Sequence, residues 1–160
     1  MSEIDLLTNA LDQAYDHKAW HGTNLRGSLR GLKATEAAWR PAPGRHNIWE
    51  LALHCAYWKY AACYRILGLG RGSFALAGSN FFARPEGEPT EKAWKTDLAL
   101  LESYHQQLRT AVTALDPARL DHKIKAWTLR ETILGVAMHD TYHGGQIQLL
   151  RRLREAATSP

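Results

Sequence analysis

The sequence predicts an all-α protein that folds as a four-helix bundle. Apolar residues recur at spacings of three and four in four segments, which is the periodicity of amphipathic helices. Residues 67–89 are rich in glycine and proline, and are long enough to cross the height of a bundle between the second and third helices. No segment of useful length alternates as a strand does. From its 160 residues we expect one domain, residues 1–160.

The first helical pattern lies within residues 4–32, but its apolar stripe is interrupted. Lys18 and His21 fall where the heptad from Ile4 requires apolar residues, and Trp20 flanks them. A polar side chain on an inward stripe needs a partner, so His21 is either a hydrogen-bonded core histidine or a pocket residue. The proline-containing residues 33–46 are expected to form a loop with a short turn.

The second and third helices have clear start signals. Asn47 is expected to cap the second helix, with Glu50 completing a capping box, and His54 lies on its inward stripe. The third helix is expected to begin after Thr90 and carries His105 on an otherwise apolar stripe. Each helix therefore presents one inward histidine.

The fourth helix carries the most informative pattern. Thr128 and Glu131 form a second capping box, and the inward stripe that follows includes His139 and His143. Because these histidines are four residues apart, their imidazoles share one helix face, about 6 Å apart at Cβ, where both can reach one metal ion. His54 on the second helix is the candidate third ligand.

Three neutral nitrogen ligands would leave an open coordination position for water or substrate. Imidazole binds several divalent metals, and we expect zinc or nickel. The alternative is a hydrogen-bonded histidine core without metal. Asp140 gives the sequence His-Asp-x-x-His, one methylene shorter than the motif of zinc peptidases, so it can act as a general base or hold a histidine in place.

Further side chains are expected to line a substrate pocket, since they lie near a proposed ligand or on an inward stripe. They are Trp20, His21, Tyr57, Trp58, His105, Tyr142 and Gln146.

The composition argues against several classes of protein. The net charge of +4 is modest and the basic residues are scattered, which predicts a solvated surface and no nucleic-acid partner. No apolar stretch approaches the roughly 18 residues of a membrane span, and the start of the chain lacks a leader pattern, so we expect no membrane association and a cytoplasmic location. Cys55 and Cys63 are too far apart on one helix to pair, and are expected to be thiols.

Three blocks of sequence, which together span nearly the whole chain, resemble the DinB-like (DinB/YfiT) superfamily of metal-binding four-helix bundle proteins. They are Ala-Trp-His-Gly at residues 19–22 with Leu25 and Leu29, Arg-Pro-Ala-Pro-Gly at 40–44 leading through His-Asn-Ile-Trp-Glu-Leu at 46–51 to His54, and Gly-Val-Ala-Met-His-Asp-Thr-Tyr-His-Gly-Gly-Gln-Ile at 135–147.

The resemblance implies an up-down-down-up bundle, often a homodimer, with a long crossover between helices 2 and 3. It implies a metal held by His54, His139 and His143. Members of this superfamily include S-transferases that use low-molecular-weight thiols, a mycothiol-dependent isomerase and proteins described as metal-dependent hydrolases. The expected function is therefore metal-dependent thiol transfer or hydrolysis on a small molecule. The alternative is a non-catalytic metal-binding or stress-response bundle that binds a partner or small ligand.

Overall fold

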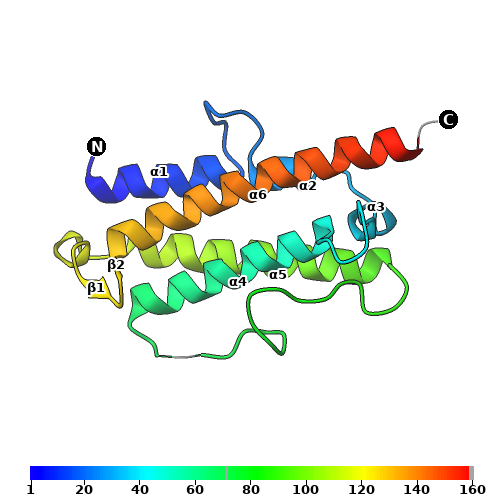
Figure 1. The fold of residues 1–160 in the computed structure, drawn as a ribbon. Coiled ribbons are helices and arrows are strands. Elements are labelled where there is room, and N and C mark those ends of the chain that lie inside the picture. Colours follow the sequence, from blue (N-terminus) through cyan, green and yellow to red (C-terminus); the bar gives the residue numbers. More distant parts are fainter. Residues whose placement is uncertain (71, 159–160) are drawn as a thin grey trace.

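The computed structural model describes residues 1–70 and 72–158 as an all-α fold (Figure 1). The prediction of an all-α protein is therefore confirmed. The elements are α1 (Glu3–Tyr15), α2 (Leu25–Leu29), α3 (Ala34–Ala38), α4 (Ile48–Leu67), α5 (Glu91–Thr113), the 3-10 turn η1 (Pro117–Arg119), β1 (Lys123–Ile124), β2 (Trp127–Thr128) and α6 (Leu129–Thr158).

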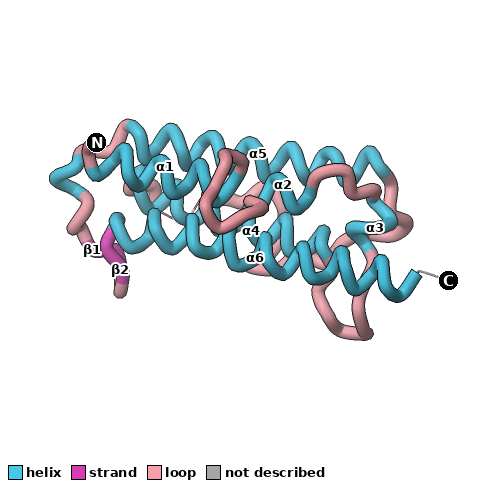
Figure 2. The backbone as a smooth tube through the Cα atoms, turned by 90° about the horizontal axis from the view of Figure 1, so that it is seen from above, coloured by secondary structure: helices cyan, strands magenta, loops and turns pink. Residues whose placement is uncertain are grey.

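The four longer helices α1, α4, α5 and α6 lie side by side (Figures 1 and 2). Helix α4 packs on α5 and α6, and α1 packs on α6 and α5, while the short α2 rests on α6. The two strands form a small antiparallel hairpin, with Lys123 opposite Thr128, just before α6. Because α4 and α6 are neighbours, residues on their facing sides can form one site.

The first predicted helical pattern is divided into two helices. Helix α1 ends at Tyr15, and the following loop projects away from the other helices before α2 begins (Figure 1). Asn24 caps α2 by accepting a hydrogen bond from the Gly27 amide at 2.8 Å. The heptad that placed His21 on an inward stripe does not continue past α1, and His21 is exposed. The expectation of a core histidine there was wrong.

The predicted caps are largely confirmed. Asn47 Oδ1 accepts a hydrogen bond from the amide of Glu50 at 2.8 Å. Helix α5 begins after Thr90 as expected, and the side chain of Thr90 also caps it. Thr128 and Glu131 form the predicted reciprocal pair, with bonds of 3.1 and 2.7 Å. The box at Asn47 is not completed, because the carboxylate of Glu50 has other partners.

The core consists of two apolar clusters, one that includes Trp49 and Trp94 and one that includes Leu11 and Ile133. On α4, α5 and α6 one cluster gives way to the other part-way along the helix, and buried polar side chains lie in or beside that stretch of each helix. These are His54 and Lys59 on α4, His105 on α5, and Asp140 and His143 on α6. Such groups are stable in a core only with polar partners. This polar layer is where the candidate site lies.

Both cysteines, Cys55 and Cys63, are buried and free, as expected. Among the described residues, no helix combines the length and apolar character needed to cross a bilayer.

The carboxylate of Glu50 joins three segments of the chain. It accepts hydrogen bonds from Arg40, from His46 at 2.8 Å and from the Arg84 amide at 3.2 Å. Burial acts to raise the pKa of Glu50, but these hydrogen bonds outweigh it and the pKa lies below its usual value. The contribution of Glu50 to stability is therefore present above about pH 4.5 and is lost as the pH falls.

We predict that Glu50→Gln lowers the free energy of unfolding by about 1–3 kcal/mol, because charge-assisted hydrogen bonds to a buried carboxylate are lost. Urea denaturation at neutral pH measures this change. Glu88→Gln, at an exposed position in the crossover, is the control and should be neutral. Equal stabilities of the two variants would contradict this role of Glu50.

Candidate metal centre

Three histidines from two helices converge on one point. The Nε2 atom of His139 lies 3.0 Å from Nε2 of His54 and 3.1 Å from Nε2 of His143. His54 comes from α4 and the other two from α6, one turn apart. His54 and His143 are each 6% exposed. The structure thus brings together the three predicted ligands, with the same nitrogen of each ring facing the others.

Two of the rings are fixed by acceptors on their other nitrogen. Nδ1 of His54 lies 2.9 Å from the backbone oxygen of Asn80, and Nδ1 of His143 lies 2.6 Å from Oε1 of Gln146. Since a carbonyl oxygen only accepts, each Nδ1 carries the hydrogen and each Nε2 presents a lone pair. Gln146 in turn donates to the hydroxyl of Tyr142 at 3.1 Å. Metal-binding histidines are commonly oriented in this way.

Burial keeps the three rings neutral. It lowers the pKa of His54 to about 4 and that of His139 to about 3, and also lowers that of His143. At neutral pH, the Nε2 lone pairs of His54 and His143 therefore both point at Nε2 of His139 from about 3 Å, and a cation between the rings would satisfy all three nitrogens. Neutral imidazole is the form that binds a metal, so the residues present fit a divalent ion.

A second group of possible ligand atoms shares His139. Candidate atoms of Cys55, His139 and Asp140 lie within 4.8 Å of one another, and Nδ1 of His139 and Oδ1 of Asp140 are buried without a partner. Burial raises the pKa of the Cys55 thiol well above its ordinary value, so the thiolate that a metal requires is disfavoured. The ammonium of Lys59 already contacts Asp140. The three histidines are therefore the better metal site.

Lys59 and Asp140 form a fully buried ion pair beside the site. Burial raises the pKa of Asp140, and the ammonium of Lys59 acts in the opposite direction. Nζ of Lys59 also lies 3.3 Å from Nδ1 of His105 and 4.8 Å from the ring centroid of Tyr15. This network connects α6 to α5 and α1 through the core.

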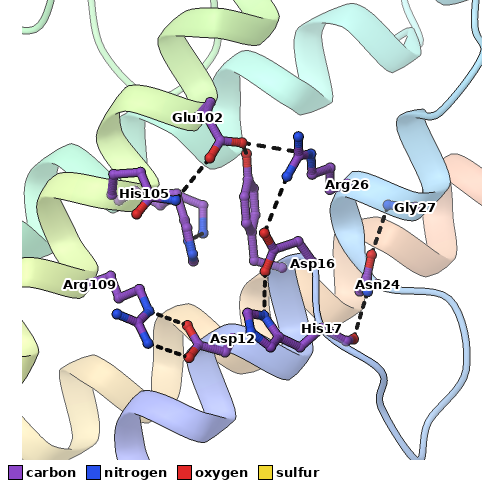
Figure 3. Close-up of polar contacts among 12 residues, drawn as sticks. Asp12, Asp16, His17, Asn24, Arg26, Gly27, Glu102, His105 and Arg109 are labelled. Atoms are coloured by element: carbon purple, nitrogen blue, oxygen red, sulfur yellow. Dashed lines mark hydrogen bonds and ion pairs between the residues drawn. The ribbon is translucent and has the colours of Figure 1, made fainter.

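His105 belongs to that network and not to the three-histidine cluster. Its pKa is lowered to about 2 by burial and then by the charge of Lys59, so the ring stays neutral. Figure 3 shows His105 near the polar contacts between α1 and α5, which include the ion pair of Arg109 with Asp12 at 2.7 Å.

The other predicted pocket residues are distributed unevenly. The ring of Trp58 lies 6.4 Å from that of His54, and the ring of Tyr142, which is 63% exposed, lies 5.0 Å from that of His143. Tyr57 lines a separate aromatic cavity under the crossover. Trp20 is fully exposed on the loop between α1 and α2, and no contact of Trp20 or His21 with the cluster occurs among the described residues.

The contacts that the crossover and Lys59 make at the site were not predicted from the sequence. Phe81 stacks on the ring of His54 with centroids 4.0 Å apart, and Asn80 also accepts a hydrogen bond from Trp58 at 3.0 Å. A contact between residues 26 positions apart leaves no periodic signal. Lys59, in contrast, could have been found from the sequence, because it lies four residues after Cys55 and so continues the inward stripe of the helix.

Comparison with known proteins is consistent with this geometry. A family model described as the DinB superfamily matches residues 17–147, a range that includes all three histidines. The match confirms the resemblance seen in the sequence. Comparisons with curated proteins and with solved structures gave no match.

We predict that Gln146→Leu raises the dissociation constant for zinc about 10- to 100-fold, because Nδ1 of His143 loses its acceptor. Competition with a chromophoric chelator measures the affinity. Gln148→Leu on the same helix removes an amide that does not contact the histidines, and should leave the affinity unchanged. If both variants bind zinc as the wild type does, the hydrogen bond has no part in orienting His143.

We also predict that the metal-free protein loses stability when the pH falls from about 7 to about 5. His54 and His139 have folded-state pKa values of about 4 and about 3, below the unfolded value of about 6.5. The unfolded chain then binds protons that the folded chain does not, at up to about 1.4 kcal/mol per pH unit for each histidine.

Urea denaturation in the presence of a chelator tests this dependence, since most carboxylates titrate below this range. His54→Gln should show a shallower dependence on pH than the wild type. Constant stability between the two pH values would show that the histidines are not held neutral.

Proposed function

The chain belongs to the DinB superfamily, and from this premise we propose that it is a divalent-metal-dependent enzyme acting on a small molecule. The observation that supports the proposal is the convergence of three neutral Nε2 atoms from α4 and α6. His54, His139 and His143 would hold the metal, with zinc or nickel as the expected ion. Their three nitrogens leave room for a further ligand.

A divalent ion held there supplies Lewis-acid chemistry toward a group in its remaining position. The residues of the chain have supporting roles. Asn80 and Gln146 fix the orientation of His54 and His143. Of the two roles expected for Asp140, that of a general base is disfavoured, because Asp140 is fully buried and paired with Lys59, and among the described residues no hydrogen bond joins Asp140 to His139. A buried, paired carboxylate is poorly placed to exchange protons with a substrate.

Thiol transfer and hydrolysis are the two proposed reactions. Both cysteines of the chain are buried, and burial raises the pKa of each thiol. Neither Cys55 nor Cys63 is thus suited to attack a substrate. A thiol nucleophile would have to be supplied from outside, which supports a low-molecular-weight thiol as co-substrate. Hydrolysis would use the same site with water.

The low exposure of His54 and His143 supports a second candidate function. A metal held in so enclosed a site can serve structure or sensing, because structural sites are closed while catalytic sites remain accessible. In this alternative the protein is a non-catalytic metal-binding or stress-response bundle that binds a partner or small ligand.

We further propose a single-domain, up-down-down-up bundle that works in the cytoplasm as a homodimer. The chain colours in Figure 1 support the helix order, since α1 and α6 run one way and α4 and α5 the other. The two free thiols suit a reducing compartment. Exposed apolar side chains along α6 supply a surface for a second copy: Leu134, Met138, Tyr142, Leu149 and Leu153.

The decisive prediction concerns metal content. The purified wild type should contain or rebind about one divalent ion per chain, and His54→Ala and His143→Ala should each lose stoichiometric binding, because two imidazoles remain. Elemental analysis after dialysis against zinc or nickel measures this. Two controls should retain the metal: His105→Ala, at a buried histidine outside the cluster, and His122→Ala, at an exposed one.

Loss of metal from the His54 and His143 variants alone would justify activity assays. Conjugation of low-molecular-weight thiols to an electrophile and hydrolysis of activated esters then distinguish the reactions, with His143→Ala as the inactive control. Metal retained by that variant would overturn the ligand assignment. A metal-loaded protein inactive in both assays would favour the non-catalytic alternative.

A further inference from the structure

A small cavity adjoins the three-histidine cluster. Its volume is about 220 Å³, below the roughly 300–1,000 Å³ of pockets for drug-sized ligands. One of its walls is His139, and the rings of Trp58 and Trp127 and the side chain of Val136 supply apolar surface. A molecule in this cavity would therefore touch a proposed metal ligand and two indole rings.

Arg65 is the cationic side chain that lines this cavity. Within the described part of the chain, its guanidinium differs from those of the other partly buried arginines in its lack of an acceptor. Among the described residues it is the one partly buried arginine with no hydrogen-bond or ion-pair acceptor. The others bind carboxylates or backbone oxygens: Arg84, Arg109, Arg130, Arg151 and Arg154. The guanidinium carbon of Arg65 lies 5.9 Å from the ring centroid of Trp58, a contact that leaves its N–H groups free.

We propose that this cavity binds a small aromatic or apolar carboxylate, with Arg65 as its anchor and the metal centre as its neighbour. This inference rests on the proposed function, since the carboxylate would be the substrate of the proposed metal site and would bind beside it. A guanidinium presents paired N–H donors that match a carboxylate, and a free, partly buried guanidinium gains most from such a partner. The apolar part of the ligand would lie between the indoles of Trp58 and Trp127.

The charges around Arg65 favour a monoanion. Glu131 also lines the cavity, but its Oε2 accepts hydrogen bonds from the amide and hydroxyl of Thr128 at 2.7 and 2.9 Å, so it is engaged in the capping box of α6. Its negative charge would still disfavour a dianionic phosphate more than a carboxylate. Arg65 also borders the larger cavity under the crossover, where Lys125 is a second cation. The test therefore has to separate the two cavities.

The first measurement compares two probes of the same shape on the zinc-loaded wild type by isothermal titration calorimetry. Phenylacetate carries the carboxylate, and phenylacetamide is its neutral isostere. We expect phenylacetate to bind about tenfold or more tightly than the amide. Equal affinities, or no binding of phenylacetate at millimolar concentrations, would overturn the proposal without any variant being needed.

The second measurement locates the anion. Arg65→Gln should weaken phenylacetate binding about 10- to 100-fold and leave phenylacetamide unaffected, whereas Arg45→Gln, at an exposed arginine outside the cavity, should bind both probes normally. Lys125→Gln should also have no effect. Binding that depends on Lys125 and not on Arg65 would place the ligand in the larger cavity and overturn the assignment.

Repeating the titrations without metal separates this inference from the metal proposal. Phenylacetate binding that depends on Arg65, in a protein that takes up no metal, would uphold the cavity and reject the metal centre. Binding that is lost with the metal but is unchanged in Arg65→Gln would mean that the carboxylate only ligates the ion, and would overturn the role of Arg65. Elemental analysis of Arg65→Gln, which should retain its metal, completes the comparison.

Discussion

The contact on which the site depends is the approach of three Nε2 atoms to about 3 Å. It is possible because α4 packs on α6, and because acceptors on the opposite side of two rings determine which nitrogen carries the hydrogen. If Nε2 of His54 carried the hydrogen, the ring would lose the lone pair that a metal needs. The hydrogen bond to Asn80 therefore orients His54 for metal binding.

The polar layer between the two apolar clusters has an energetic cost. Burying an ammonium and a carboxylate is expensive, and their attraction offsets that cost only with good geometry and further partners. Lys59 has such partners in Asp140, His105 and the ring of Tyr15. The same burial that makes the layer costly keeps the histidines neutral. Stability and ligand chemistry thus depend on one low-dielectric region.

Local sequence predicted much of this structure. Asn47 and Thr128 were identified as caps because a capping box depends on residues three positions apart, and the start of α5 after Thr90 was also predicted. The convergence of His54 on His139 followed from inward stripes alone. Other features depend on distant contacts that sequence patterns do not encode: Asn80 meets His54 from a segment without periodicity, and Lys59 meets Asp140 across 81 positions. The end of α1 at Tyr15 was missed because apolar spacing resumes at Leu25.

The buried pair of Lys59 with Asp140 also bears on charge balance. The carboxylate that follows His139 in the chain is already neutralised, and three neutral imidazoles add no charge of their own. The donor set would therefore leave both positive charges of a divalent ion uncompensated in a region where charges interact strongly. An anionic group that completes the coordination would supply that compensation, and a bound water would supply part of it by losing a proton. A metal held by this donor set would therefore favour anionic ligands over neutral ones of the same shape.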